Sequence, residues 1–336
     1  MRALFVVNDP AELTGSQTTS MLARALVRRG HTVHFAGVAN LALREDGHVM
    51  ARGHALGPGL VEARSPLGAV MSPNPEAIDL SEIELVWIRT NPARGGRGWA
   101  HQTMLNLLRI ARDGGTTVVN DPVGLARASS KLYLHRVPPA FRPRTLVSGD
   151  REEISAFIAG CSGGKAVLKP LTGTRGQDVY LIELATERNL NAIIDTLVRD
   201  GYAIVQEFVP EAMEGDTRLV LLFGALLEAE GVPLVVRRVP TGMDFRSNVH
   251  VGGRAVPTAV TASMRECASV LGPILMEDGL GLVGVDFIGG KVVELNVFST
   301  GGFWEAEQFY EAPFIETCVA EVVAHVQRGA RSKHGE

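Results

Sequence analysis

The sequence has 336 residues, of which 46% are hydrophobic and 21% are charged, a composition that is ordinary for a folded protein of two or three units. The net charge of −4 excludes a global basic field that would attract nucleic acid or an anionic membrane. No apolar run reaches the ~18 residues of a membrane helix, and the start of the chain lacks the pattern of a secretory signal. Three scattered cysteines form no C-x-x-C pair, so neither a disulfide framework nor a zinc site is expected. We expect a cytoplasmic protein with no nucleic-acid or membrane partner.

Residues 1–122 alternate between predicted strands and helices. Strands are expected at 3–8, 32–38, 85–90 and 116–120, and helices at 18–30 and 99–112. Such alternation is typical of a mostly parallel sheet with both faces covered. This pattern predicts an N-terminal α/β domain over residues 1–122.

Two further units are expected after this domain. The unit at 123–202 begins with a helix at 123–134 and a proline-rich connector at 137–143. Its strands are expected at 144–148, 166–170 and 178–184, and its helices at 151–160 and 187–199. The strand-rich unit at 203–330 begins with a strand at 203–209 and carries helices near 262–278 and 310–327.

The most informative segment is the apolar run 283–297, whose acidic and amide residues are Asp286, Glu294 and Asn296. Charges inside buried strands are costly unless they are paired, and oxygen ligands of this kind suit magnesium. The three residues therefore predict a metal site on a hairpin. Solvated acids at a strand edge are the alternative interpretation.

The spacing of these residues constrains the turn between the strands. Glu294 and Asn296 share a face because they are two residues apart. With a two-residue turn at Gly289-Gly290, Asp286 would lie on the opposite face from Glu294, whereas a three-residue loop restores the same face. The metal-site hypothesis thus predicts an odd-numbered loop.

Two other groups of residues suit anions. Lys169 ends an apolar strand and is followed by the loop 172–176, whose N–H groups could bind a phosphate, although an ordinary β-turn fits the loop equally well. Several arginines lie near predicted strand ends, where guanidinium groups could bind carboxylates or phosphates bidentately. Any one of them could instead be a solvated surface residue. These arginines are Arg218, Arg237, Arg238, Arg246 and Arg254.

In combination and in order, the motifs resemble the signature of the prokaryotic glutathione synthetase family. The resemblance covers nearly the whole chain and rests on these segments: 6–10, 18–30, 88–92, 119–122, Lys131, 169–170, 215–218, 238–240, 246–248, 252–254, Asp286 and 294–297. It implies an ATP-grasp fold with an N-terminal parallel α/β (pre-ATP-grasp) domain.

The resemblance also implies cofactors and site residues. ATP would be bound by Lys131, Lys169, Gly173, Thr174, Gly176, Gln206, Glu207, Phe208, Val209 and Asp216, with adenine near the hinge 206–209. Two Mg²⁺ ions, for which Mn²⁺ could substitute, would be held by Asp286, Glu294 and Asn296. The segments 172–176 and 246–253 are the lid candidates.

The chemistry implied by the resemblance is ATP-dependent joining of a carboxylate to an amine through an acyl phosphate, with γ-glutamylcysteine and glycine as substrates. Arg218 and Arg238 would be catalytic, stabilising charge on the acyl phosphate and the tetrahedral intermediate. Substrates would contact Asp9, Arg89, Arg246, Asn248, Gly253, Ser299, Thr300 and Gly301. Related enzymes form homo-oligomers, and the same is expected here.

Two departures from the family pattern leave alternatives open. Arg175 adds a charge to the glycine-rich loop, and residues 299–304 replace the family's usual Ser-Pro segment. A ligase for a different acid or amine is therefore an alternative. A non-catalytic nucleotide-binding homologue is a further one, against which the retained Asp286, Glu294 and Lys169 argue.

Overall fold

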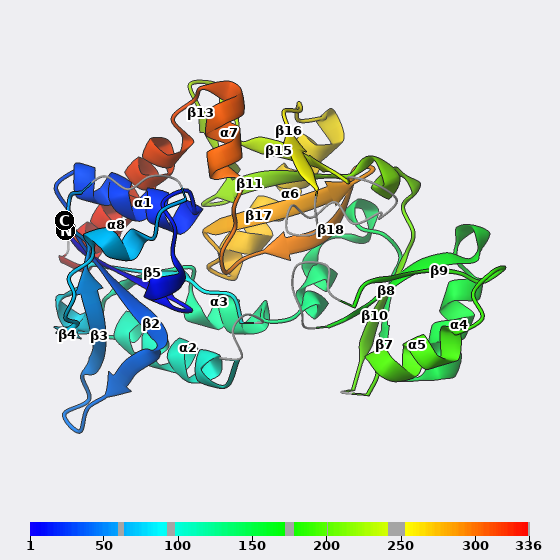
Figure 1. Cartoon of the computed structure of the whole chain (residues 1–336), viewed down its shortest axis with the longest axis horizontal. Helices are drawn as coiled ribbons and strands as arrows, with labels where there is room; N and C mark the ends of the chain where they lie inside the picture. The colour runs from blue at the N-terminus through cyan, green and yellow to red at the C-terminus, as the bar shows by residue number, and fades with distance from the viewer. Residues whose placement is uncertain (60–63, 93–97, 172–177, 200, 241–252, 335–336) are drawn as a thin grey trace.

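Three large sheets organise the chain, and each is formed by a separate stretch of sequence (Figure 1). The computed structural model describes all residues except 60–63, 93–97, 172–177, 200, 241–252 and 335–336. In Figure 1 the N-terminal sheet lies at the left, the central sheet at the right and the C-terminal sheet between and above them. Within the described residues, none of the helices has both the length and the apolar character needed to cross a membrane.

The N-terminal sheet has the strand order β4-β3-β2-β1-β5-β6. Its strands are β1 (Arg2–Val7), β2 (Thr32–Leu43), β3 (Val49–Ala55), β4 (Glu76–Asp79), β5 (Leu85–Arg89) and β6 (Thr117–Val119). The neighbours β2, β1, β5 and β6 are parallel, whereas β3 and β4 pair in antiparallel fashion. The predicted α/β unit is confirmed in its essentials, and the carboxyl ends of β1 and β5 lie side by side, where open α/β sheets bind ligands.

Helices cover this sheet because their apolar residues recur on one face. They are α1 (Thr18–Arg28), α2 (Gly98–Asp113) and α3 (Pro122–Arg127). The expected helix at 123–134 is wrong, because α3 ends at Arg127 and a separate 3-10 helix spans Lys131–Arg136. Ser130 caps that second helix, and the Lys131 N–H donates to the carbonyl of Leu171, so the chain turns towards the central sheet.

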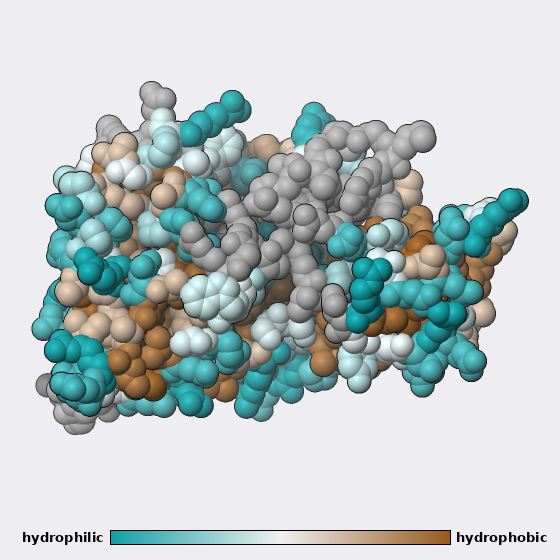
Figure 2. Space-filling view, turned by 60° about the horizontal axis from the view of Figure 1, so that its bottom comes forward, coloured by the Kyte–Doolittle hydropathy of each residue, from teal (hydrophilic) through white to brown (hydrophobic). Residues whose placement is uncertain are grey.

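The central sheet is antiparallel, with the strand order β7-β10-β8-β9. Its elements are β7 (Thr145–Ser148), α4 (Arg151–Ala159), β8 (Lys165–Pro170), β9 (Tyr180–Glu183), α5 (Leu190–Leu197) and β10 (Ala203–Glu207). The sequence assigned β10 to the third unit, but it lies between β7 and β8, so the expected division at residue 202 cuts through a sheet. Figure 2 shows this unit projecting at the right of a face that mixes hydrophilic and hydrophobic side chains.

The C-terminal sheet has the order β16-β15-β11-β17-β18 and carries the predicted hairpin. Its strands are β11 (Asp216–Leu222), β12 (Ala225–Leu226), β15 (Val235–Val239), β16 (Arg254–Val256), β17 (Leu282–Ile288) and β18 (Lys291–Asn296), with a small ribbon of β13 (Glu228–Ala229) and β14 (Val232–Pro233) beside them. Helix α6 (Ala262–Glu277) packs against this sheet and contributes Leu271 and Leu275 to its core.

The C-terminal helices return the chain to the N-terminal unit. They are α7 (Phe303–Tyr310) and α8 (Phe314–His334). The expected helix at 310–327 is thus displaced, and α7 was not expected; Glu311 at φ 53° and Pro313 separate the two helices. Helix α8 lies beside α1 (Figure 1), and Arg28 donates to Glu316 at 2.6 Å.

Asn120 connects the N-terminal and C-terminal units. Its side chain is buried, and Nδ2 donates to the carbonyls of Leu282 (2.9 Å) and Val297 (2.6 Å). Its Oδ1 accepts from the N–H of Leu282 at 2.7 Å. One amide therefore satisfies three backbone groups next to the hairpin that carries the predicted metal ligands.

We expect Asn120→Ala to lower the free energy of unfolding by about 2–4 kcal/mol, because it leaves buried backbone groups unsatisfied. Urea unfolding followed by circular dichroism measures the change. Asn106→Ala, at an exposed position on α2, is the matched control and should stay within about 0.5 kcal/mol of wild type. Equal stability of the two variants would contradict the connecting role of Asn120.

Candidate active site

Two neighbouring cavities open where the carboxyl ends of β1 and β5 face the C-terminal sheet. The larger has a volume of about 600 Å³ and the smaller about 450 Å³. They share the lining residues Thr90, Asn91, Asn296 and Ser299. A site with two compartments suits a reaction between two bound molecules.

A buried carboxylate, Asp286 on β17, lies at the centre of a charged network. Arg218 on β11 binds it bidentately, from Nε to Oδ1 and from Nη2 to Oδ2, both at 2.7 Å. Arg238 on β15 donates from Nη2 to Asp286 Oδ2 at 2.7 Å and from Nε to Asp216 Oδ1 at 2.7 Å. The sheet imposes this geometry, since Arg218 pairs in register with Asp286 and Asp216 pairs with Arg238.

The network fixes the charge of its members. Burial by itself would raise the pKa of Asp286, but Arg218 and Arg238 outweigh it and hold that pKa well below its usual range. Burial would lower the pKa of Arg238, and the two aspartates instead raise it. Asp286 is therefore ionised and Arg238 is charged at the wall of the larger cavity, which Arg218 and Arg238 both line.

The turn between β17 and β18 differs from the sequence prediction. Ile288 pairs with Lys291, so the turn has the two residues Gly289 and Gly290, and the expected odd-numbered loop is wrong. The φ angles of 53° and 77° at these glycines are the left-handed conformations of a tight two-residue hairpin turn.

A β-bulge, and not a longer loop, brings Asp286 to the same face as Glu294. The register shifts so that Phe287 faces Val292 and Asp286 faces Glu294, which places the extra residue within the strand. Directly opposed residues of antiparallel strands project from the same face, and Asn296 follows two residues later. The three predicted ligands therefore do share a face.

The chemistry of this group fits magnesium. Asp286 Oδ1 accepts one hydrogen bond, and Asn296 Nδ2 donates to Asp286 Oδ2 at 3.1 Å, which leaves the amide oxygen of Asn296 to act as a ligand. Glu294 makes no hydrogen bond or ion pair with the described residues. Within the described part of the chain no three acids, histidines or cysteines form a metal cluster, so phosphate and water oxygens would complete the coordination, as is usual for Mg²⁺.

Two lysines from different elements lie near Glu294. Burial lowers the pKa of Lys131, and it lowers the pKa of Lys169 at the end of β8 to about 8; Glu294 raises both. Lys131 lines the smaller cavity together with Glu294. The structure thus gathers the two predicted phosphate-binding lysines and a predicted metal ligand.

The other predicted nucleotide residues fall into two groups. Gln206, Glu207, Phe208 and Val209 lie at the end of β10, outside both cavities; Gln206 donates to Thr145 at 3.3 Å, and Glu207 accepts from the N–H of Ser162 at 2.9 Å. Asp216 is tied to Arg238. Outside the described residues lie Gly173, Thr174, Arg175, Gly176, Arg246 and Asn248, and with them most of both lid candidates.

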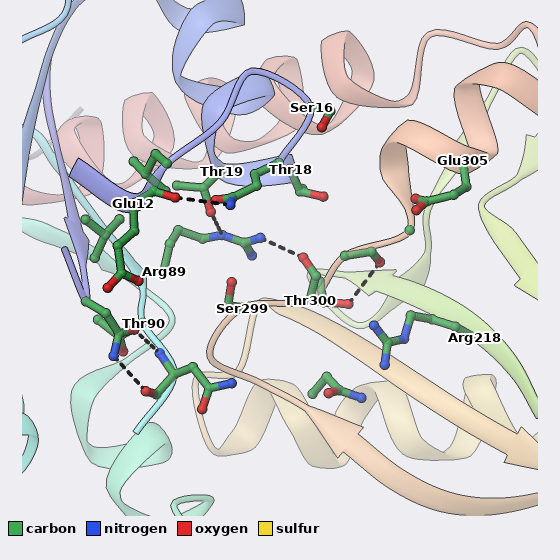
Figure 3. Close-up of a pocket in the computed structure, with 18 of the residues that line it drawn as sticks. Glu12, Ser16, Thr18, Thr19, Arg89, Thr90, Arg218, Ser299, Thr300 and Glu305 are labelled. Carbon is green, nitrogen blue, oxygen red and sulfur yellow. Dashed lines mark hydrogen bonds between the residues drawn. The ribbon is translucent and has the colours of Figure 1, made fainter. Parts of the chain in front are cut away.

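Most of the predicted substrate residues line the larger cavity: Asp9, Arg89, Ser299, Thr300 and Gly301. Gly253 is buried before β16 and does not line it. Figure 3 shows Arg89 extended between Thr19 and Thr300, with Ser299 below it and Arg218 farther along the cavity.

The sequence analysis did not select several other lining residues: Asn8, Glu12, Thr18, Thr19, Asn91 and Glu305. Asn8 and Asn91 could have been found, because they lie in the segments 6–10 and 88–92 that carry the family resemblance, just past the ends of the parallel strands β1 and β5. They exchange hydrogen bonds of 2.8 and 2.6 Å. Glu305 could not have been found, because it lies on the unexpected helix α7.

We expect Asp286→Asn to lower the free energy of unfolding by about 3–5 kcal/mol, because it leaves two buried guanidinium groups without their shared counter-ion. Urea unfolding at neutral pH measures this loss. The difference from wild type should shrink below pH ~4, where the unfolded chain takes up a proton on Asp286 that the folded chain does not.

The control for this variant is Asp195→Asn, which removes an exposed ion pair with Arg151. It should cost less than about 1 kcal/mol. If both substitutions had the same small effect, the network would not be the stabilising feature described above.

Comparisons with known proteins agree with this geometry. The chain matches the family model "Prokaryotic glutathione synthetase, N-terminal domain" over residues 1–126 and "Prokaryotic glutathione synthetase, ATP-grasp domain" over residues 130–311. It is 37% identical to a glutathione synthetase of Gloeobacter violaceus, over 91% of this chain and 92% of that protein. It is 32% identical to a glutathione synthetase of Synechococcus elongatus, over 98% of this chain and 100% of that protein.

Among solved structures, the crystal structure of a D-cycloserine synthetase matches with a TM-score of 0.67 and 17% identity, over 97% of this chain and 99% of that one. An ATP-grasp ligase complexed with its minimal precursor matches with a TM-score of 0.60 and 19% identity, over 96% and 98% of the two chains. These similarities concern the fold alone. Taken with the family models, they show that the chain is an ATP-dependent carboxylate–amine ligase with the ATP-grasp fold and belongs to the prokaryotic glutathione synthetase family.

Proposed function

We propose that this protein joins γ-glutamylcysteine to glycine, with ATP activating the cysteinyl carboxylate. The observation that carries the proposal is the pair of adjoining cavities that meet at Asn296 and Ser299. One contains the lysine and glutamate expected to bind phosphates and metal, and the other contains three arginines. ATP in the smaller cavity and the acid substrate in the larger cavity would thus meet near Asn296 and Ser299.

A carboxylate must be activated before an amine can displace one of its oxygens. Transfer of the γ-phosphoryl group of ATP gives an acyl phosphate and ADP, and attack of the amine then releases inorganic phosphate. We assign Lys131 and Lys169 to hold the phosphates, because they are cations beside Glu294. Mg²⁺, when bound by Asp286, Glu294 and Asn296, would neutralise phosphate charge and orient the transfer.

Arg218 and Arg238 are the groups we assign to the reacting carboxylate. Their guanidinium groups line the larger cavity while Asp286 holds them from behind. Preoriented donors of this kind stabilise the negative charge that develops on the acyl oxygens and need no rearrangement during the reaction. The neighbouring Asp216 is then a positioning residue for Arg238 as well as a candidate nucleotide contact.

Finer expectations rest on the family resemblance. They are a second Mg²⁺ ion, the substitution of Mn²⁺, nucleotide contacts by residues 206–209 and by the loop 172–176, substrate contacts by 246–253, a homo-oligomeric assembly and a cytoplasmic location. Metal titration by calorimetry and analytical ultracentrifugation test the stoichiometry of the ions and of the subunits, respectively.

The proposed activity predicts glycine-dependent release of ADP from ATP and γ-glutamylcysteine. A coupled assay should give robust turnover with glycine, and mass spectrometry should identify glutathione. The segment 299–301, which lines the larger cavity, departs from the family pattern and favours one second candidate, a ligase for another amine. Turnover only with a different amine supports that candidate, and no turnover with any acid and amine pair would remove both.

Glu294→Gln tests the metal assignment. Turnover should fall at least ~100-fold, because the change removes a proposed metal ligand, while the melting temperature should stay within about 2 °C, since Glu294 makes no hydrogen bond or ion pair with the described residues. Glu266→Gln, at an exposed position on α6, should change neither quantity. Wild-type turnover in Glu294→Gln would exclude Glu294 from metal binding.

A further inference from the structure

Asp278 is a buried carboxylate outside the site described above. It is 7% exposed, lies outside both cavities and is the C-cap residue of helix α6. An acid at this position meets the partial negative charge of a helix C-terminus, which is unfavourable. Burial would also raise its pKa, but hydrogen bonds from Tyr133 and Arg127 hold that pKa below its usual range. Partners outside its own helix therefore keep the side chain ionised, which indicates a tertiary role.

The two oxygens of this carboxylate bind both ends of one short stretch of chain. Oδ1 accepts from Arg127 Nη1 at 2.7 Å, at the last residue of α3. Oδ2 accepts from the hydroxyl group of Tyr133 at 2.7 Å and lies 3.2 Å from Arg136 Nε. Lys131 lies between these contacts, at the start of the 3-10 helix. One side chain thus fixes the chain before and after a lysine expected to bind phosphate.

The main chain around Asp278 is itself closely packed. Its carbonyl oxygen lies against Gly124 of α3, where an added Cβ would be only 1.9 Å away. The carbonyl of Gly279 accepts from the N–H of Asp121 at 2.9 Å, and Gly279 has a φ of 69°, in the left-handed region that favours glycine. The carboxylate therefore extends from a tightly packed junction between α3 and the end of α6.

The surroundings of Lys131 oppose its position, so an anchor is required. Burial lowers its pKa, while Glu294 raises it. Burial and the charge of Lys131 both lower the pKa of Lys169, to about 8, again against Glu294. Two cations thus repel each other beside one carboxylate, and a 3-10 helix of six residues has weak hydrogen bonds of its own. Without Asp278, the repulsion would move Lys131 away from Glu294.

The anchored stretch also contacts the strand that carries the second lysine. The N–H of Lys131 donates to the carbonyl of Leu171 at 2.9 Å, two residues after Lys169 at the end of β8. Both Lys131 and Leu171 line the smaller cavity. Asp278 therefore affects both lysines, one through the 3-10 helix and the other through this hydrogen bond.

We propose that Asp278 is a positioning residue for the nucleotide, and that it acts through Tyr133 to hold Lys131 where this lysine meets the phosphates of ATP. This inference rests on the proposed function, in which Lys131 and Lys169 hold the phosphates. It adds a residue on α6, outside the cavities, on which the affinity for a nucleotide depends. Neither the Asp278 carboxylate nor the Tyr133 hydroxyl group contacts a reactant in this scheme.

A purely structural role for Asp278 predicts a different result. Loss of its contacts would then lower stability and affect every substrate equally. A positioning role instead predicts weaker nucleotide binding by the folded enzyme, while KM for γ-glutamylcysteine and for glycine stays within about 2-fold of wild type. The two roles are therefore separable by comparing the nucleotide with the other substrates.

Tyr133→Phe removes only the hydroxyl group that donates to Asp278. The Kd for MgADP, measured by calorimetry without acid or amine, should rise about 10-fold, and KM for ATP should rise in parallel. Asp278→Ala should raise both by at least ~30-fold. Asp278→Asn should recover part of that loss, because it keeps an oxygen acceptor for Tyr133. An unchanged Kd for MgADP in Tyr133→Phe would overturn the proposal.

Thr116→Val is the matched control. It also removes a buried hydroxyl group that donates one hydrogen bond of 2.7 Å, in this case to the Leu80 carbonyl in the N-terminal unit. It should lower stability to a similar extent but leave the Kd for MgADP within about 2-fold of wild type, because the two sites are independent. Equal weakening of MgADP binding in Thr116→Val and Tyr133→Phe would show a general effect of lost stability and contradict the proposal.

The Lys131→Met background shows whether Asp278 acts through the lysine. In that background, Tyr133→Phe should raise the Kd for MgADP by less than about 2-fold, because the group to be positioned is absent. A rise as large as in the wild-type background would show that Tyr133 acts independently of Lys131, which the proposal does not allow.

Nucleotide binding separates this inference from the proposed function. Absence of glycine-dependent ADP release from ATP and γ-glutamylcysteine by the wild type contradicts the proposed function, but the MgADP titrations still test the role of Asp278. Normal turnover with an unchanged MgADP affinity in Tyr133→Phe contradicts only that role. If Asp278→Ala fails to fold, Tyr133→Phe in the two backgrounds still decides the question.

Discussion

One buried carboxylate, Asp286, constrains the arrangement of the whole C-terminal sheet around the site. It is 1% exposed and is bound by guanidinium groups from two different strands. A buried charge is tolerated only when partners neutralise it, so β11, β15 and β17 must keep the register that brings Arg218 and Arg238 to it. The ion pairs of Asp286 with Arg218 and Arg238 hold the three strands together, and they also orient the two guanidinium groups at the wall of the larger cavity.

This constraint has a consequence for metal binding. In the proposed metal site, Asp286 would serve both as the counter-ion of two arginines and as a ligand, whereas Glu294 on the next strand has no hydrogen-bonded or ion-paired partner among the described residues. The bulge makes both tasks possible, because it sets Glu294 directly opposite Asp286. If the proposed metal site is correct, loss of Asp286 would affect both folding and metal binding, whereas loss of Glu294 would affect metal binding alone.

The sequence was sufficient to predict features that depend on local patterns. Apolar runs predicted the parallel strands β1, β2, β5 and β6 of the N-terminal sheet. The spacing of Glu294 and Asn296 predicted a shared face, and the metal-site hypothesis added Asp286 to it. The sequence could not show where the extra residue of the hairpin lies. Either a bulge within β18 or a turn with one more residue places Asp286 and Glu294 on the same face. The sequence analysis also misassigned β10, since the partners of an antiparallel strand are set by tertiary packing. Asn120 lies in the segment 119–122 that contributes to the family resemblance, but its connecting role gave no signal, because its two backbone acceptors and one backbone donor lie more than 160 residues away.

The segment 299–301 joins the two halves of the site. Ser299 lines both cavities, and the Thr300 carbonyl accepts from the guanidinium group of Arg89. Thr300 also contacts the sheet closely, because a Cβ added at Gly284 would lie 2.1 Å from its hydroxyl oxygen. A change here would therefore move Arg89 and the wall of the smaller cavity at the same time. A segment that departs from the family pattern is thus the segment that connects the two cavities.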